Sequence, residues 1–272
     1  MNSASEMGSE AVGFIPFKPC VVIPVYNHEH AIGIVVESIR AQCVPIVLVD
    51  DGSDAACAAE LDRLSKLENI SLLRHEQNRG KGAAVCWGLR YAFEQGFTHA
   101  IQVDADGQHT LADISRFIEE ARIRPKHVIC GHPIFDASIP KSRYYGRYLT
   151  HALVWFETLS FEIIDSMCGF RLYPLATTVA LLDEHGVGAR MDFDTEMLVR
   201  LFWRGAPLHW IATRVSYPLD GVSHFRMFLD NVRMTTLHVR LICGMLIRLP
   251  VLLSHKVARV VMRQPRKGDV HV

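Results

Sequence analysis

The strongest constraint on the fold of this chain is a regular alternation, over its first hundred residues, of short apolar runs and longer helical patterns. Four runs rich in β-branched residues end in polar turns, at residues 21–25, 46–49, 70–73 and 100–103. Helical patterns lie between them, at residues 31–42, 55–67 and 81–95. This order predicts an α/β fold with a mostly parallel, doubly wound, Rossmann-like sheet flanked by helices.

Polar and acidic residues follow each of the four predicted strands. They are Pro24 and Tyr26 at the first, Asp50 and Asp51 at the second, Lys81 after the third, and Asp104 and Asp106 after the fourth. Sheets of this kind bind ligands beyond the carboxyl ends of their strands. We therefore expect these side chains to meet at one edge of the sheet.

The sequence Asp104-Ala105-Asp106 is the first candidate metal site. Two carboxylates two residues apart, just past a strand, can hold one Mg²⁺ or Mn²⁺ while diphosphate oxygens complete its coordination. A turn or a helix N-cap is the alternative interpretation, and the chain has a second pair of this spacing at Asp192 and Asp194.

Two further turns suit parts of a nucleotide. An aspartate of the Asp50-Asp51 pair can accept hydrogen bonds from a base or ribose, although a turn followed by a helix cap explains the same residues. Residues 78–82 form a glycine-rich, basic turn in which backbone amides and Lys81 suit phosphate. A plain helix start is the alternative there, and the GxxxxGK[ST] phosphate loop is absent.

Together these pieces resemble family 2 glycosyltransferases of the GT-A fold, in particular the dolichol-phosphate-mannose-synthase-like or polyprenyl-phosphate branch. The resemblance extends over residues 20–224 and is carried by VVIPVYNHEHAI, IVLVDDGSD, NRGKGAAVCWGLRYAFEQGFTHAIQVDADGQH, GFRLY and DTEMLVRLFWRGAPLHWIATRVSYPLDGVSH. It implies inverting transfer from a UDP- or GDP-linked sugar. It also implies nucleotide contacts by Pro24, Tyr26, Asp51 and Lys81, metal binding by Asp104 and Asp106, and a further metal contact by Gln108.

Several residues are candidates for activating the acceptor of the sugar or for binding its phosphate. A hydroxyl acceptor needs a general base, whereas a phosphate acceptor is already anionic. Asp194 and Glu196 are the candidate catalytic acids, with Asp194 favoured by alignment through Arg200, and helix N-terminal acids are the alternative. Arg171 resembles the branch's acceptor-side arginine, with a surface ion pair as the alternative. His224 and Arg226 are positioned to close over the diphosphate, although a lone histidine is more often structural.

The C-terminal segment is basic and apolar. From residue 237 onward it carries seven basic residues against Asp269 alone, namely Arg240, Arg248, Lys256, Arg259, Arg263, Arg266 and Lys267. This pattern suits helices on an anionic membrane surface. Alternatively, the segment covers the chain's own core or forms a dimer contact. No uninterrupted apolar run is long enough to predict a spanning helix. We expect a loose tail at 1–19, a GT-A domain at 20–225 and membrane-associated helices at 226–272.

Composition excludes some other functions. Lys plus Arg and Asp plus Glu both number 29, which argues against general nucleic-acid binding. The seven cysteines contain no CxxC, as expected of buried thiols in a reducing compartment. The resemblance and the basic C-terminal segment together imply a cytoplasmic, metal-dependent transferase at the inner face of a membrane, with a nucleotide-sugar donor and a lipid-linked acceptor. A degenerate nucleotide-sugar binder and a sugar nucleotidyltransferase are the alternatives, and the latter lacks its GGxGTRL-like loop.

Overall fold

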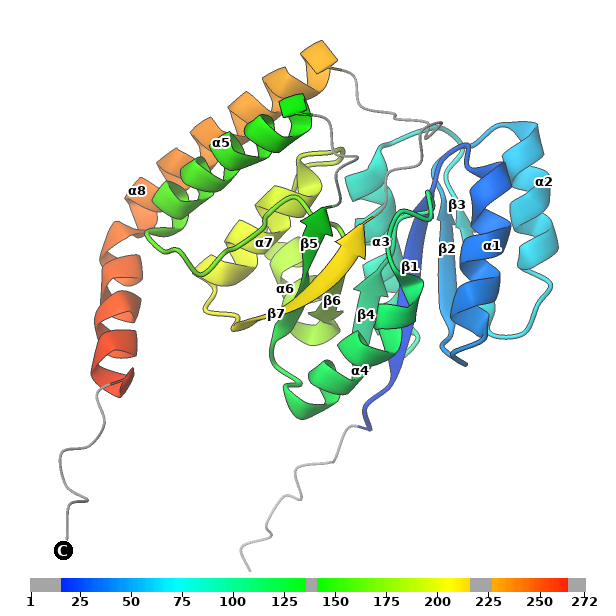
Figure 1. Ribbon diagram of the computed structural model, residues 1–272, viewed down its shortest axis with the longest axis horizontal. Helices are drawn as coiled ribbons and strands as arrows, with labels where there is room; N and C mark the ends of the chain where they lie inside the picture. The colour runs from blue at the N-terminus through cyan, green and yellow to red at the C-terminus, as the bar shows by residue number, and fades with distance from the viewer. Residues whose placement is uncertain (1–15, 136–140, 216–226, 264–272) are drawn as a thin grey trace, which may run out of the picture.

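The computed structural model describes residues 16–135, 141–215 and 227–263, and within them the chain forms one sheet with helices on both faces (Figure 1). The strands are β1 (Pro19–Val25), β2 (Ile46–Asp50), β3 (Ile70–Arg74), β4 (His99–Gln102), β5 (Val128–Phe135), β6 (Arg171–Pro174) and β7 (Leu208–Val215). The helices are α1 (Glu29–Arg40), α2 (Ala55–Leu64), α3 (Lys81–Glu94), η1 (Leu111–Asp113), α4 (Ile114–Ile123), α5 (Lys141–Thr158), α6 (Leu175–Glu184), α7 (Phe193–Trp203) and α8 (Met227–Arg263).

The strand order explains where a ligand can bind. It is β3-β2-β1-β4-β6-β5-β7, and every neighbouring pair is parallel except those that involve β6, which is antiparallel to both β4 and β5. The first four strands confirm the predicted parallel α/β sheet. Their carboxyl ends meet at one edge, next to the start of β6 and the N-termini of α3 and α7.

Each face of the sheet has its own core because successive strand residues point to opposite sides. On β1, Val21, Ile23 and Val25 pack with α1, α2 and α4. Cys20 and Val22 pack on the other face with α3, α6 and α7. Nearly all these side chains are fully buried, as expected for a sheet covered on both sides.

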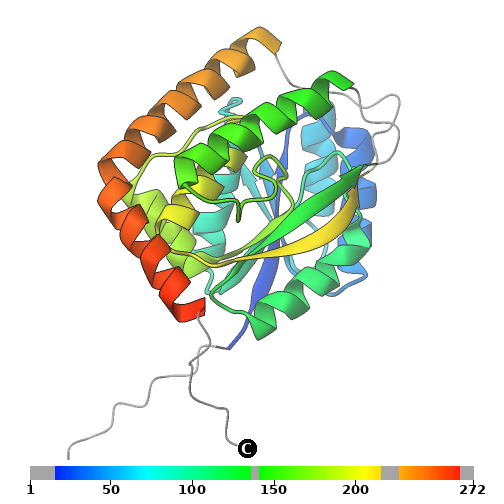
Figure 2. The ribbon, with the colours of Figure 1, turned by 60° about the vertical axis from the view of Figure 1, so that its left-hand side comes forward.

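The C-terminal extension is a single 37-residue helix, α8, that lies beside α5 (Figures 1 and 2). Its inner side contributes Leu237, Leu241, Met245 and Leu252 to the same core as α3 and α7. The helix therefore covers part of the chain's own core, which was one of the alternatives for this segment. Its outer side is rich in exposed apolar residues.

Candidate active site

Three charged side chains from distant parts of the sequence meet at the carboxyl end of β4. Lys81, the first residue of α3, places its Nζ 2.8 Å from Asp104 Oδ1 and 3.0 Å from Asp104 Oδ2. The same ammonium group donates to Asp194 Oδ2 at 3.0 Å. The fold thus brings together a predicted donor residue, a predicted metal ligand and a predicted catalytic acid, as the sequence led us to expect.

A buried amide, which the sequence reasoning missed, supports this cluster. Gln102 is fully buried on β4 and donates through Nε2 to Asp194 Oδ1 at 2.9 Å, so both oxygens of Asp194 have partners. The hydroxyl of Tyr173 lies 3.4 Å from Gln102 Oε1. A polar residue within an otherwise apolar strand, two positions before Asp104, was the available signal.

The loop before β6 comes close to these groups at Gly169. A Cβ atom at this position would lie 2.7 Å from Gln102 Nε2 and 2.8 Å from Lys81 Nζ. A side chain at this position would therefore push the ends of Gln102 and Lys81 away from where they now lie, and the glycine lets the loop approach the cluster without moving them.

Asp50 and Asp51 are buried and bound within the protein. Asp50 pairs with Arg74 Nε at 2.7 Å and accepts from the backbone N–H of Ser53 at 2.9 Å. Asp51 accepts from the backbone N–H groups of Arg79, at 2.8 Å, and Gly80, at 2.7 Å, and its Oδ1 also lies 2.8 Å from His75 Nδ1. Asp51 therefore fixes the turn that leads directly into Lys81.

The first-strand candidates lie beside this turn. Pro24 is buried on β1 opposite Val49, and Tyr26 follows the strand in a half-buried position. Asn27 links the two neighbouring strand ends, because its backbone N–H donates to Ser53 Oγ and its Oδ1 accepts from the N–H of Asp54.

Glu196 lies in a different environment from Asp194. It is completely buried and accepts from Gly188 N at 2.7 Å, Arg200 Nε at 2.8 Å and the Arg240 guanidinium at 2.9 Å. These contacts tie α7 to α8 and to the loop before α7. The structure does not bring Glu196 to the Lys81 cluster.

Arg171, the candidate acceptor-side arginine, is also fully buried. Its guanidinium donates to the backbone carbonyl oxygens of Asp194 and, at 2.6 Å, of Ser166. It lies behind Asp194 rather than on an open surface, so the alternative of a surface ion pair is wrong. The other two acceptor candidates, His224 and Arg226, lie outside the described residues.

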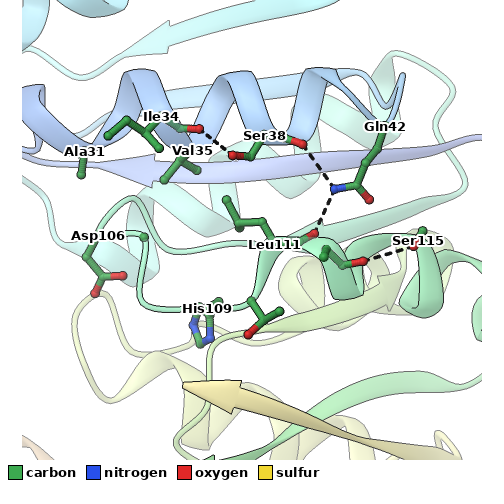
Figure 3. A pocket seen from close by; sticks show the side chains of 12 residues that line it. Ala31, Ile34, Val35, Ser38, Gln42, Asp106, His109, Leu111 and Ser115 are labelled. Carbon is green, nitrogen blue, oxygen red and sulfur yellow. Dashed lines mark hydrogen bonds between the residues drawn. The ribbon is translucent and has the colours of Figure 1, made fainter. Parts of the chain in front are cut away.

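A groove of about 810 Å³ runs between α1 and the segment 106–115 and opens beside Asp106 and His109 (Figure 3). One wall is formed by Ala31, Ile34, Val35 and Ser38 of α1 and by Gln42 in the turn that follows it. Gln42 joins the walls by donating to the Leu111 carbonyl oxygen at 2.9 Å.

Comparison with known proteins identifies the family. Residues 20–182 match the model for glycosyl transferase family 2. This chain belongs to that family. The match covers the first three βα units, the Asp104-Ala105-Asp106 sequence and β6.

Relatives of this family 2 glycosyltransferase act on polyprenyl phosphates. The chain is 29% identical over 197 residues to the UDP-N-acetylglucosamine–dolichyl-phosphate N-acetylglucosaminyltransferase of Methanococcus voltae. This alignment covers 66% of this chain and 78% of that protein. It is 28% identical over 186 residues to the undecaprenyl-phosphate mannosyltransferase of Micrococcus luteus, covering 63% and 74%. The resemblance to the polyprenyl-phosphate branch is therefore confirmed.

Solved structures confirm the GT-A fold of the family 2 chain. Glucosyl-3-phosphoglycerate synthase from Mycobacterium tuberculosis, in complex with Mn²⁺, UDP-glucose and phosphoglyceric acid, superimposes with a TM-score of 0.61. Sequence identity is 14%, and the alignment covers 84% of this chain and 79% of that one.

The acidic residues of the family 2 site suit a cation shared with a ligand. Among the described residues no group of three His, Cys, Asp or Glu side chains could hold a metal ion by itself. Two carboxylates completed by substrate phosphates are, however, the usual arrangement for Mg²⁺. Asp104 and Asp106 are separated by one residue. Among the described residues, Asp106 Oδ1 accepts a hydrogen bond only from the backbone N–H of Gln108, at 3.0 Å.

The charges at this site influence one another strongly. Burial and the negative charge of Asp104 raise the pKa of Asp106 above its ordinary value. Burial alone would raise the pKa of Asp104 as well, but Lys81 and His109 hold it well below its usual range. Two acids that repel each other are typical of a place where a cation is expected, so the residues fit a divalent metal.

Proposed function

We propose that this glycosyltransferase moves a sugar, with inversion, from a UDP- or GDP-linked donor to a polyprenyl phosphate in a metal-dependent reaction. The observation that carries the proposal is the Lys81–Asp104–Asp194 cluster at the carboxyl edge of the sheet. The polyprenyl phosphate acceptors named for its relatives support the choice of acceptor.

The residues divide into a donor set and a supporting set. Pro24, Tyr26, Lys81 and Asp104 would contact the nucleotide and its diphosphate, while Asp50 and Asp51 would act through the turns that they hold. Asp104 and Asp106, with Gln108 beside them, would hold Mg²⁺ or Mn²⁺. The metal would supply positive charge to the diphosphate leaving group.

The acceptor reaction needs little proton transfer if the acceptor is a phosphate. An acceptor phosphate oxygen would form a bond to the anomeric carbon as the bond from that carbon to the diphosphate breaks. Asp194, held by Lys81 and Gln102, would then serve to orient the site, and Arg171 would hold the Asp194 backbone in place. His224 and Arg226 remain proposed diphosphate contacts.

A location at the inner face of a membrane is part of the proposal. By length and composition, segment Leu229–Ser254 of α8 is apolar enough to cross a membrane, with a mean hydropathy of 1.6. Large exposed apolar residues also occur on α5, on the following loop and on α8. A polyprenyl substrate would require such a surface.

Thermal-shift measurements with UDP- and GDP-sugars test the donor site. A ligand that binds the folded state raises its melting temperature. We expect a shift with one nucleotide in Mn²⁺ or Mg²⁺ and none in EDTA. Asp104→Asn should abolish this shift while the protein remains folded, and intact donor binding in that variant would refute the metal assignment. Sugar transfer to a polyprenyl phosphate, measured next, tests the acceptor.

A further inference from the structure

Lys81 occupies the position that a cation would take at Asp104. Its Nζ lies within 3.0 Å of both carboxylate oxygens of Asp104 and of Asp194 Oδ2, and only 19% of its side chain is exposed. A divalent metal binds carboxylate oxygens at about 2.0–2.6 Å. An ammonium group in contact with both oxygens of Asp104 therefore blocks the same oxygens from a metal.

The charge balance of the cluster explains why Lys81 stays there. Asp104 lies just after β4 and Asp194 lies in α7, and each is largely removed from solvent. Without a cation between them, two acids would face each other at a place where charge interactions are poorly screened. Lys81 supplies that cation from within the chain.

The geometry also gives Lys81 another place to go. Lys81 is the first residue of α3, where Asp51 and the Ala189 carbonyl oxygen already accept from backbone N–H groups, so a phosphate would be bound by the ammonium group itself. The flexible stem of Lys81 carries the charge at its end, and Gly169 has no side chain next to Nζ. A donor diphosphate bound at this edge would attract the ammonium away from Asp104.

We infer that Lys81 is an internal counter-ion that occupies the cation position at Asp104 until the donor arrives, so that metal and nucleotide bind cooperatively. The inference rests on the proposed function and extends it to the order of binding. Metal alone then binds weakly because it must displace Lys81. Metal and donor together bind well because the diphosphate takes over the ammonium group.

Binding of Mn²⁺ to the purified chain, followed by the electron paramagnetic resonance signal of the free ion, tests this inference without measuring activity. We expect Lys81→Met to bind Mn²⁺ alone roughly tenfold more tightly than the unchanged chain. The same variant should bind the nucleoside diphosphate of the donor, UDP or GDP, more weakly. Lys81→Arg retains the charge and should keep the weak Mn²⁺ binding, as should Lys126→Met, which removes an exposed lysine far from the site.

A folded Lys81→Met variant that binds Mn²⁺ no better than the unchanged chain would overturn the inference. The unchanged chain provides a second test should the variant not fold. Either UDP or GDP should raise the Mn²⁺ affinity of the unchanged chain roughly tenfold or more, and equal Mn²⁺ affinity with neither, with UDP and with GDP would also overturn the inference. If no form of the chain binds Mn²⁺, even with UDP or GDP, the proposed metal-dependent function on which the inference rests is overturned instead.

Discussion

At the scale of single residues, Asp194 is held by contacts from three different elements, α3, β4 and β6. Its carboxylate accepts from Lys81 and Gln102, and its backbone carbonyl oxygen accepts from Arg171. The neighbouring acid Asp192 has a much simpler environment and accepts from Arg190 N at 3.1 Å. The two acids of this DxD sequence therefore have different roles.

Replacing Asp194 tests its place in the reaction. Asp194→Asn keeps the size of the side chain but removes the charge that holds Lys81. We expect kcat for sugar transfer to fall about 10²-fold, because the groups that Asp194 orients would be misplaced. Steady-state kinetics with a polyprenyl phosphate acceptor measures this effect. Asp192→Asn is the matched control and should change kcat less than twofold, and equal losses in the two variants would contradict the assignment.

Sequence patterns predicted which polar residues lie at the strand ends better than they predicted the buried side chains around those residues. Asp104 follows the buried strand β4 and Lys81 begins the helix after β3, so their meeting at the sheet edge follows from the parallel order. Asp194 joins them through the resemblance to the family and not through local pattern. Gln102 and the burial of Arg171 depend on how β4 and β6 pair, which a single sequence does not display.

At the scale of secondary-structure elements, the four predicted strands and three predicted helices of the first hundred residues correspond to β1 to β4 and α1 to α3 within a few residues at each end. The four-residue β6 and the helix α6 that follows it were not predicted as elements. β6 is too short for a clear alternation, and its antiparallel pairing between β4 and β5 is decided by tertiary packing. The strand β6 could therefore be identified only from the structure.

Helix α8 is tied to the rest of the fold through buried carboxylates. Arg240 donates to Glu196 of α7, and His238 Nδ1 lies 2.7 Å from Glu157 Oε1 of α5. Both glutamates are fully buried. Breaking a buried ion pair leaves an uncompensated charge, which costs far more than breaking a surface pair.

Arg240→Met tests this attachment. Because Arg200 remains paired with Glu196, we expect a loss of about 2 kcal/mol in the free energy of unfolding, measured by urea denaturation. Arg90→Met breaks the more exposed Arg90–Asp183 pair and should cost less than about 1 kcal/mol. A smaller effect at Arg240 than at Arg90 would show that α8 is held by apolar packing alone.

Asp165 joins α5 to the loop before β6 and makes stability depend on pH. Burial alone would raise its pKa, but hydrogen bonding to His151 and the charge of Arg147 hold it well below the usual range. A carboxyl with a lowered folded-state pKa stabilises the fold above its unfolded pKa, about 3.9, and this contribution is lost as pH falls further.

Asp165→Asn should therefore destabilise the protein by about 3 kcal/mol at pH 7. The difference between the variant and the unchanged chain should shrink as pH is lowered below about 4. Thermal or urea unfolding followed across this range measures both effects. A difference that stays constant with pH would mean that the charge of Asp165 contributes nothing.

At the scale of the whole molecule, exposed apolar side chains gather on the elements around α8. They are Tyr148, Leu149 and Phe156 on α5, Phe161, Ile164 and Met167 on the following loop, and Leu229, Val232, Val239, Leu246, Ile247, Val251 and Leu253 on α8. The two helices lie side by side in both views (Figures 1 and 2). Large exposed apolar areas mark protein or membrane contacts.

Binding to anionic vesicles tests the proposed membrane location. Ile247 is 79% exposed on α8, and Ile247→Glu should reduce vesicle binding, measured by co-sedimentation, roughly tenfold. Ile123→Glu is the matched control, because Ile123 is 61% exposed at the end of α4. Equal binding by the two variants would place the membrane contact elsewhere.

The position of α8 has a practical consequence for dissecting the enzyme. A shortened chain that ends before residue 227 would lack the cation that Arg240 brings to Glu196 and the partner that His238 brings to Glu157. It would also uncover the core surface now covered by Leu237, Leu241 and Met245. Solubility is therefore better sought by polar substitutions on the outer side of α8 than by removing the helix.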